Sequence, residues 1–152
     1  SVQKLWFREQ LRLAKDLDMP VIIHSRDACQ DTFDILTEEE HSPKKAVIHC
    51  FSGSKEMALE YVKRGYFIGI GGVVTFSNAK KLVEVTKEIP LSHILVETDA
   101  PYLTPNPHRG KRNDSKYLVD IIKEIAAIKN ISPQEVEDVT YENGKRFFFP
   151  EE

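Results

Sequence analysis

The fold follows from residues 46–72, AVIHCFSGSKEMALEYVKRGYFIGIGG. The stretch opens with a short apolar run rich in β-branched residues, 46–51, which predicts a strand. An amphipathic segment follows, in which Ser54 is the expected N-cap of a helix that continues to about residue 63. Gly65 suits the end of that helix, and a second apolar run, 67–72, comes after it. Continuous apolar strands separated by an amphipathic helix indicate a parallel βαβ unit that is covered on both faces.

Strands and helices also alternate before and after this stretch, and successive strands begin roughly 22 to 28 residues apart. This spacing predicts an α/β fold with one parallel sheet. A proline-containing loop and two further helices follow the last strand, and the second helix opens with a capping box. The expected strands are 21–24, 46–51, 67–72 and 94–99; the expected helices are 1–17, 28–40, 54–63, 78–88, 115–129 and 132–148; the loop is 100–114.

Composition narrows the class of protein. The chain has 152 residues, 41% of them hydrophobic and 30% charged, which is ordinary for a globular domain and argues against disorder. A formal charge of −3 argues against a generally basic nucleic-acid coat. The longest nearly apolar stretch, 67–76, is too short to cross a membrane, so no membrane association is expected. Two cysteines are too few for a disulfide framework, which favours a cytoplasmic location.

Metal-capable side chains stand at three of the four expected strand ends. These residues are His24, His49 and Asp99, while the remaining strand ends in Gly71-Gly72. Functional groups of parallel α/β proteins gather at the carboxyl ends of the strands, so we expect the three side chains to converge. Two imidazoles and a carboxylate predict a site for Mg²⁺, Mn²⁺ or Zn²⁺, although a single histidine at a strand end is more often structural.

Alternation along the strands predicts which neighbours share the site. Glu97 lies on the same face as Asp99 but one layer deeper, where it should pair with a cation, a strand neighbour or a lysine. Gly69 and Gly71 remove bulk from one face and should leave space for an ion or a substrate. Cys50 alternates away from His49 and is expected to pack outward as a small hydrophobic residue.

A basic cluster is expected on the same rim. Arg26 follows His24, and Arg109, Lys111 and Arg112 lie in the loop after Asp99. Arginine forks fit phosphate oxygens, although such a run of charges is more often a solvated loop. The backbone amides of residues 52–54, at a helix start, offer another phosphate contact. The remaining histidines are less suited to ligation: His41 and His93 are expected outside the site, and His108 lies in the basic loop.

Five motifs strongly resemble the TatD-type metal-dependent deoxyribonucleases. They are VIIHSRDA (21–28), HCFSG (49–53), ETDAPYLTP (97–105), RGKRN (109–113) and ENGKRFF (142–148). The resemblance covers essentially the whole chain. It implies a TIM-type barrel of the metal-dependent hydrolase kind and divalent-metal hydrolysis, which in several members acts on DNA from the 3′ end. It further implies that His24 and His49 are metal ligands, and that Asp99 is a ligand near the attacking water.

The resemblance is to the C-terminal half of such a barrel. Family members carry an HxH pair after the first strand and a bridging glutamate after the fourth, and this sequence has neither. Its four βα units correspond to strands five to eight, so residues 1–152 are expected to form a single partial domain. The resemblance implies two metal ions for the complete barrel, and this sequence contains only part of their ligands. The expected partner is therefore a missing N-terminal half or a second half-barrel of the same kind.

Three functional hypotheses follow. The first is hydrolysis of DNA phosphodiester bonds, in single strands or at 3′ ends, by a metal-activated water that Asp99 orients or deprotonates; Arg26, Arg109 and Lys111 would offset phosphate charge. The second is metal-dependent hydrolysis of another phosphate, ester, amide or lactone, because the fold does not fix the substrate. The third is a non-catalytic metal-binding module that lacks half of its site.

Overall fold

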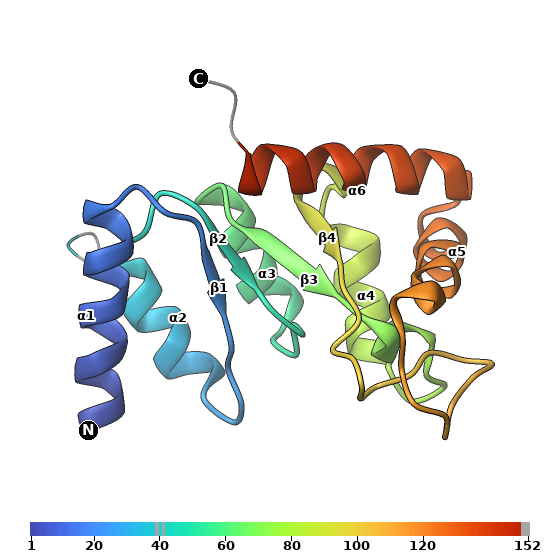
Figure 1. Ribbon diagram of the computed structural model, residues 1–152, viewed down its shortest axis with the longest axis horizontal. Coiled ribbons are helices and arrows are strands. Elements are labelled where there is room, and N and C mark those ends of the chain that lie inside the picture. The colour runs from blue at the N-terminus through green and yellow to red at the C-terminus, as the bar shows by residue number, and fades with distance from the viewer. Residues whose placement is uncertain (39, 41, 150–152) are drawn as a thin grey trace.

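A four-stranded parallel sheet forms the centre of the molecule (Figure 1). The computed structural model describes residues 1–38, 40 and 42–149. Within these residues the strands follow one another in sequence order, β1-β2-β3-β4, and every neighbouring pair is parallel. This confirms the predicted α/β class and the predicted βαβ connections. The strands are β1 (Val21–Ile23), β2 (Ala46–Ile48), β3 (Phe67–Ile70) and β4 (Ile94–Val96).

Helices alternate with the strands as predicted. Two caps that were predicted from local sequence are present: the Ser54 hydroxyl accepts a hydrogen bond from the amide of Met57, and the Ser132 hydroxyl accepts one from the amide of Glu135. The helix expected over 28–40 is shorter and ends at Thr37; residue 39 lies outside the described residues. The α-helices are α1 (Val2–Asp16), α2 (Cys29–Thr37), α3 (Lys55–Lys63), α4 (Lys80–Glu88), α5 (Leu118–Lys129) and α6 (Pro133–Phe148), and three short 3₁₀ turns are η1 (Gly72–Thr75), η2 (Leu91–His93) and η3 (Ser115–Tyr117).

The strands end earlier than predicted because the backbone turns at their functional ends. Cys50 has φ +46° and Asp99 has φ +54°, a conformation that no strand residue adopts. The extended pairing therefore stops at Ile48 in β2 and at Val96 in β4. The residues that carry the chemistry consequently lie in short loops just beyond the strands.

One face of the sheet forms the main hydrophobic core. Ile48, Ile68 and Ile94 point to this face and are at most 4% exposed. They pack in one cluster with side chains from the covering helices, among them Leu36 and Val85. Alternation along the strands therefore places this core on one side and leaves the remaining side chains for the opposite face.

The opposite face is only partly covered. Phe147 of α6 packs on Val47 and Phe67, while Ile22 at the sheet edge is 59% exposed. A cleft of about 1020 Å³ opens over this face and is lined by residues of the strands and of α6. In the described part of the chain, β1 and β4 are the outer strands of the sheet, each with one edge that no further strand pairs. No helix in that part is long and apolar enough to span a bilayer.

Candidate metal centre

His49 and Asp99 meet at the carboxyl end of the sheet. The Nε2 atom of His49 lies 3.1 Å from an Asp99 carboxylate oxygen, although the two residues are 50 positions apart. The ring of His24 is 6.2 Å from the ring of His49, measured between centroids. All three side chains line one cleft of about 270 Å³. The structure thus places together the three residues that the strand-end pattern proposed as ligands.

Glu97 orients the His49 ring. One Glu97 carboxylate oxygen lies 2.6 Å from His49 Nδ1, and the other accepts a hydrogen bond of 2.5 Å from the backbone amide of Cys50. A carboxylate can only accept, so Nδ1 is the donor to Glu97, and Nε2 is directed at the Asp99 carboxylate. Glu97 pairs with a histidine rather than with a lysine, and it holds a proton on Nδ1, so that Nε2 is the nitrogen that would bind a metal ion after losing its own proton.

The two glycines at the end of the third strand, Gly69 and Gly71, make room for the Glu97 side chain beside the cleft. A Cβ atom on Gly69 would lie 2.6 Å from a Glu97 carboxylate oxygen and 3.0 Å from the carbonyl oxygen of Ile48. Gly71 faces the same side chain at 3.6 Å. The space beside Gly69 is therefore taken up by the Glu97 side chain, which reaches across β3 to His49, while Gly69 and Gly71 also line the cleft of about 270 Å³.

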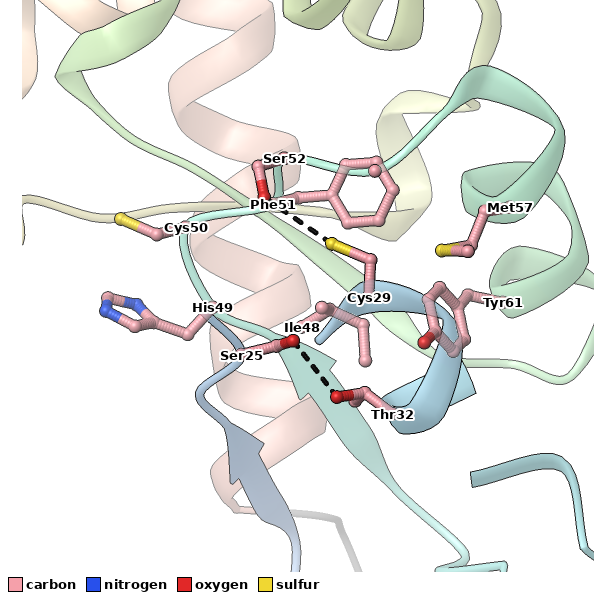
Figure 2. A pocket seen from close by; sticks show the side chains of 11 residues that line it. Ser25, Cys29, Thr32, Ile48, His49, Cys50, Phe51, Ser52, Met57 and Tyr61 are labelled. Atoms are coloured by element: carbon pink, nitrogen blue, oxygen red, sulfur yellow. Dashed lines mark hydrogen bonds between the residues drawn. The ribbon is translucent and has the colours of Figure 1, made fainter. Parts of the chain in front are cut away.

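Cys50 does not point outward, as strand alternation predicted it would. Its positive φ breaks the alternation, and Figure 2 shows His49 and Cys50 on one side of the β2 end, with Phe51 on the other. Ligand atoms of His49, Cys50 and Glu97 all lie within 4.8 Å of one another. Burial and then the charges of Glu97 and Asp99 raise the pKa of the Cys50 thiol, so the thiol stays protonated near neutral pH. A strand pattern alone contains no sign of this turn.

The charge balance of the centre fits a cation. Burial disfavours protonation of His49, but hydrogen bonds and charge from Glu97 and Asp99 outweigh it, so the pKa of His49 is raised overall. The two carboxylates thus favour positive charge at the position between them. A divalent cation could replace the proton on Nε2 and be held by His24, His49 and Asp99, a donor set compatible with Mg²⁺, Mn²⁺ or Zn²⁺.

Only part of the predicted basic cluster reaches this cleft. Arg26 lines it together with His24 and Asp99. The guanidinium of Arg109 instead lies 3.7 Å from the ring centroid of Phe76. Lys111 and Arg112 are exposed and do not line the cleft in the described structure.

The other polar residues considered from the sequence lie in different surroundings. Ser52 lines the cleft. Cys29 contacts the Ser52 hydroxyl through its sulfur, at 3.7 Å, beside a small cavity (Figure 2). His108 stacks on Tyr117 with ring centroids 4.3 Å apart. His93 precedes β4 at the opposite end of the sheet, and His41 lies outside the described residues.

Sequence reasoning missed Asn113. This side chain is 4% exposed, and its amide nitrogen donates to the carbonyl oxygens of Thr98, at 2.7 Å, and Tyr102, at 2.6 Å. Its own backbone amide donates to the carbonyl of Pro101. These bonds hold the backbone on both sides of Asp99. The only sequence signal was an asparagine at the end of the basic loop, which by itself predicts a turn.

A comparison with protein families now identifies the group. The family model described as "TatD related DNase" matches residues 1–149. The chain belongs to the TatD family.

Relatives in the TatD family include proteins whose names describe them as uncharacterized metal-dependent hydrolases. YabD of Bacillus subtilis is 47% identical over 148 residues, an alignment that covers 97% of this chain and 58% of YabD. YcfH of Escherichia coli K12 is 39% identical over 142 residues, covering 93% of this chain and 54% of YcfH. The chain therefore spans little more than half the length of these TatD-family relatives.

Solved TatD structures share the fold. The TatD homolog YjjV of Escherichia coli superimposes with a TM-score of 0.84 at 34% identity, covering 92% of this chain and 54% of that chain. A TatD-family hydrolase of Entamoeba histolytica gives a TM-score of 0.81 at 24% identity. The order and direction of the strands in this chain are thus those of a TatD-family fold.

Proposed function

We propose that this chain carries half of the active site of a metal-dependent hydrolase, and that its substrate is DNA. The observation that supports this most is the set of Glu97, His49 and Asp99, joined by contacts of 2.6 and 3.1 Å at the carboxyl end of the sheet. The names of the relatives support metal-dependent hydrolysis, and the description of the family model, TatD related DNase, supports DNA as the substrate.

Each residue of the centre has a separate role in this proposal. His24, His49 and Asp99 would hold a divalent cation, which supplies Lewis acidity and lowers the pKa of water. Glu97 keeps the proton on His49 Nδ1, so that Nε2 stays available. The free oxygen of Asp99 orients the attacking water and accepts its proton. Arg26, on the same cleft, offsets the charge that develops on the phosphate.

The other half of the site has to come from outside the four strands. The alignments cover only 58% of YabD and 54% of YcfH, and in the described part of this chain both sheet edges are unpaired and one sheet face is only partly covered. We propose that four more strands close an eight-stranded barrel and complete a two-ion site. These strands would be supplied by an N-terminal half or by a second copy of the chain.

The test is an assay of 3′-labelled single-stranded oligonucleotides with Mn²⁺ or Mg²⁺. The chain is assayed alone and after co-expression with the N-terminal half of YabD. We expect cleavage by the complemented protein and at least about a hundredfold loss in Asp99→Asn, because the proton acceptor is removed. Asp16→Asn is the matched control, since Asp16 is exposed at the end of α1.

Other outcomes separate the alternatives. Equal cleavage by wild type and Asp99→Asn would remove Asp99 from the mechanism. Hydrolysis of bis-p-nitrophenyl phosphate or of simple esters, without cleavage of oligonucleotides, would favour a different hydrolase substrate. Weak metal binding by this chain, without hydrolysis of any of these substrates, would favour a metal-binding module that lacks half of its site, whereas tight binding of two ions would count against that module.

A further inference from the structure

A second depression continues from the candidate metal centre. The cleft that contains His49 shares four lining residues with a neighbouring depression of about 180 Å³. The shared residues are Phe51, Ser52, Val73 and Leu82; the second depression adds Gly53, Asn78, Ala79 and Lys81. One groove therefore leads from His49 to Lys81, between the loop that precedes α3 and the segment that joins η1 to α4. We call it the Lys81 groove.

The floor and the rim of the Lys81 groove differ in polarity. Its floor is apolar, since Phe51 is 5% exposed, Leu82 is 9% exposed and Val73 is half-buried. Its rim is polar, with the exposed side chains of Asn78 and Lys81. A flat apolar ring with an attached anion matches this division, because the ring is desolvated against the floor while the anion meets the ammonium group.

The Lys81 ammonium is available to bind an anion. Lys55, on the neighbouring helix, is paired with Glu84 at 2.7 Å, whereas Lys81 forms no salt bridge in the described part of the chain. Lys81 does act on Glu56, but the pKa of Glu56 is lowered mainly by its own backbone amide and by Ser54, and less by Lys55 and Lys81. The charge of Lys81 is thus only weakly compensated.

We propose that the Lys81 groove binds the nucleotide next to the scissile phosphate of a single-stranded substrate. The base lies on Phe51 and Leu82, and the following phosphate meets Lys81. This inference rests on the proposed function, because it takes the phosphate at the metal centre as its starting point. It adds a reason why the protein would prefer a strand of several nucleotides to a mononucleotide.

The test compares Lys81→Ala with Lys80→Ala. Lys80 is the preceding residue of α4, equally exposed and outside the groove, so it is the matched control. Affinity for a fluorescent thymidine tetranucleotide is measured by anisotropy with the Mn²⁺-loaded protein, alone and complemented as above. We expect Lys81→Ala to raise the Kd about fivefold and to reduce the slope of log K against log salt by about 0.7, the value for one lost phosphate contact on a single strand. Lys81→Arg should restore both.

Failure of the Lys81 groove proposal can be distinguished from failure of the proposed hydrolase function. The groove proposal would be overturned if Lys81→Ala and wild type bound the tetranucleotide with equal affinity, or if Lys81→Ala and Lys80→Ala lost affinity equally. Absence of tetranucleotide binding by wild type would also overturn it. In that case, hydrolysis of bis-p-nitrophenyl phosphate by the same preparation would leave the hydrolase proposal standing, and its absence would count against both.

Discussion

At the scale of single residues, the candidate centre depends on a long reach by one side chain. Glu97 leaves β4, passes over Gly69 of β3 and hydrogen-bonds His49 beyond β2. The third strand therefore has to lack a side chain where the carboxylate crosses it. Glycine is required here for space, since Gly69 has an ordinary φ.

Gly69→Ala tests this requirement. The new methyl group would meet the Glu97 carboxylate and the Ile48 carbonyl, so we expect the free energy of unfolding to fall by about 1–3 kcal/mol, together with weaker Mn²⁺ binding. The control is Gly144→Ala in α6, where nothing lies within 4 Å of the added methyl group. This control should raise helix stability by up to about 1 kcal/mol. Urea unfolding and calorimetric titration of Mn²⁺ measure both effects, and unchanged behaviour of Gly69→Ala would contradict the argument.

His93 gives a pH dependence that can be separated from the metal centre. Burial, and then the charge of Arg146, lowers the pKa of His93. The unfolded chain therefore binds a proton more readily than the folded chain does. Stability from this group is full above about pH 6.5 and is lost as the pH falls through that value toward the folded pKa.

The measurement is urea unfolding of wild type and His93→Phe between about pH 8 and pH 5, with a chelator present. Phenylalanine keeps a ring against Phe67, whose centroid lies 5.6 Å from that of His93. We expect the free energy of unfolding of wild type to fall relative to the variant as the pH is lowered. A constant difference over this range would show that His93 titrates equally in both states.

At the scale of elements, the segment from Thr98 to Asn113 acts as one braced loop. Asn113 closes it with two donated bonds, Thr104 donates to the Lys111 carbonyl, and Asn106 donates to Thr75 at the end of η1. A side chain on Gly72 would overlap the backbone of Leu103, so the loop also packs directly on η1. The position of Asp99 is therefore set by this loop as well as by β4.

Asn113→Ala should loosen the loop. It leaves the carbonyls of Thr98 and Tyr102 without their donor at a buried position, which costs about 1–3 kcal/mol. Asn106→Ala removes a bond at an exposed position and should cost less than about 1 kcal/mol. Thermal unfolding gives the stabilities, and hydrogen exchange of residues 98–104 reports the loop. Equal effects of the two variants would mean that Asn113 does not brace it.

The elements also show why the sequence predicts some features and not others. Ser54 and Ser132 act on amides three residues away, so their caps follow from local sequence. The orientation of Cys50 depends on a backbone turn, and the pairing of Glu97 with His49 depends on a contact across β3; neither leaves a local pattern. The convergence of His24, His49 and Asp99 was predictable because parallel strands align their carboxyl ends. The position of Arg109 was not, because a ring distant in sequence, Phe76, holds it.

At the scale of the whole molecule, the open inner face should drive association. Ile22 is 59% exposed beside a cleft of about 1020 Å³, and β1 and β4 present unpaired edges. We expect the isolated chain to self-associate with increasing concentration in sedimentation velocity. Ile22→Lys should shift the chain toward monomer, whereas Val2→Lys on α1, where Val2 is 71% exposed, should not. A monomer at every concentration would contradict this expectation.

The bracing of the loop after Asp99 also determines where the sequence is free to change. Its fixed points are Asn113, Thr104 and Asn106, whereas Gly110 has a φ of +85° and open space, with no atom within 4 Å of the position that a Cβ would take. Insertions at Gly110 would lengthen the loop after Asp99 without moving the backbone that carries the Asp99 carboxylate. Directed evolution of substrate preference could therefore randomise residues 109–112 first, and natural divergence within the family could use the same position.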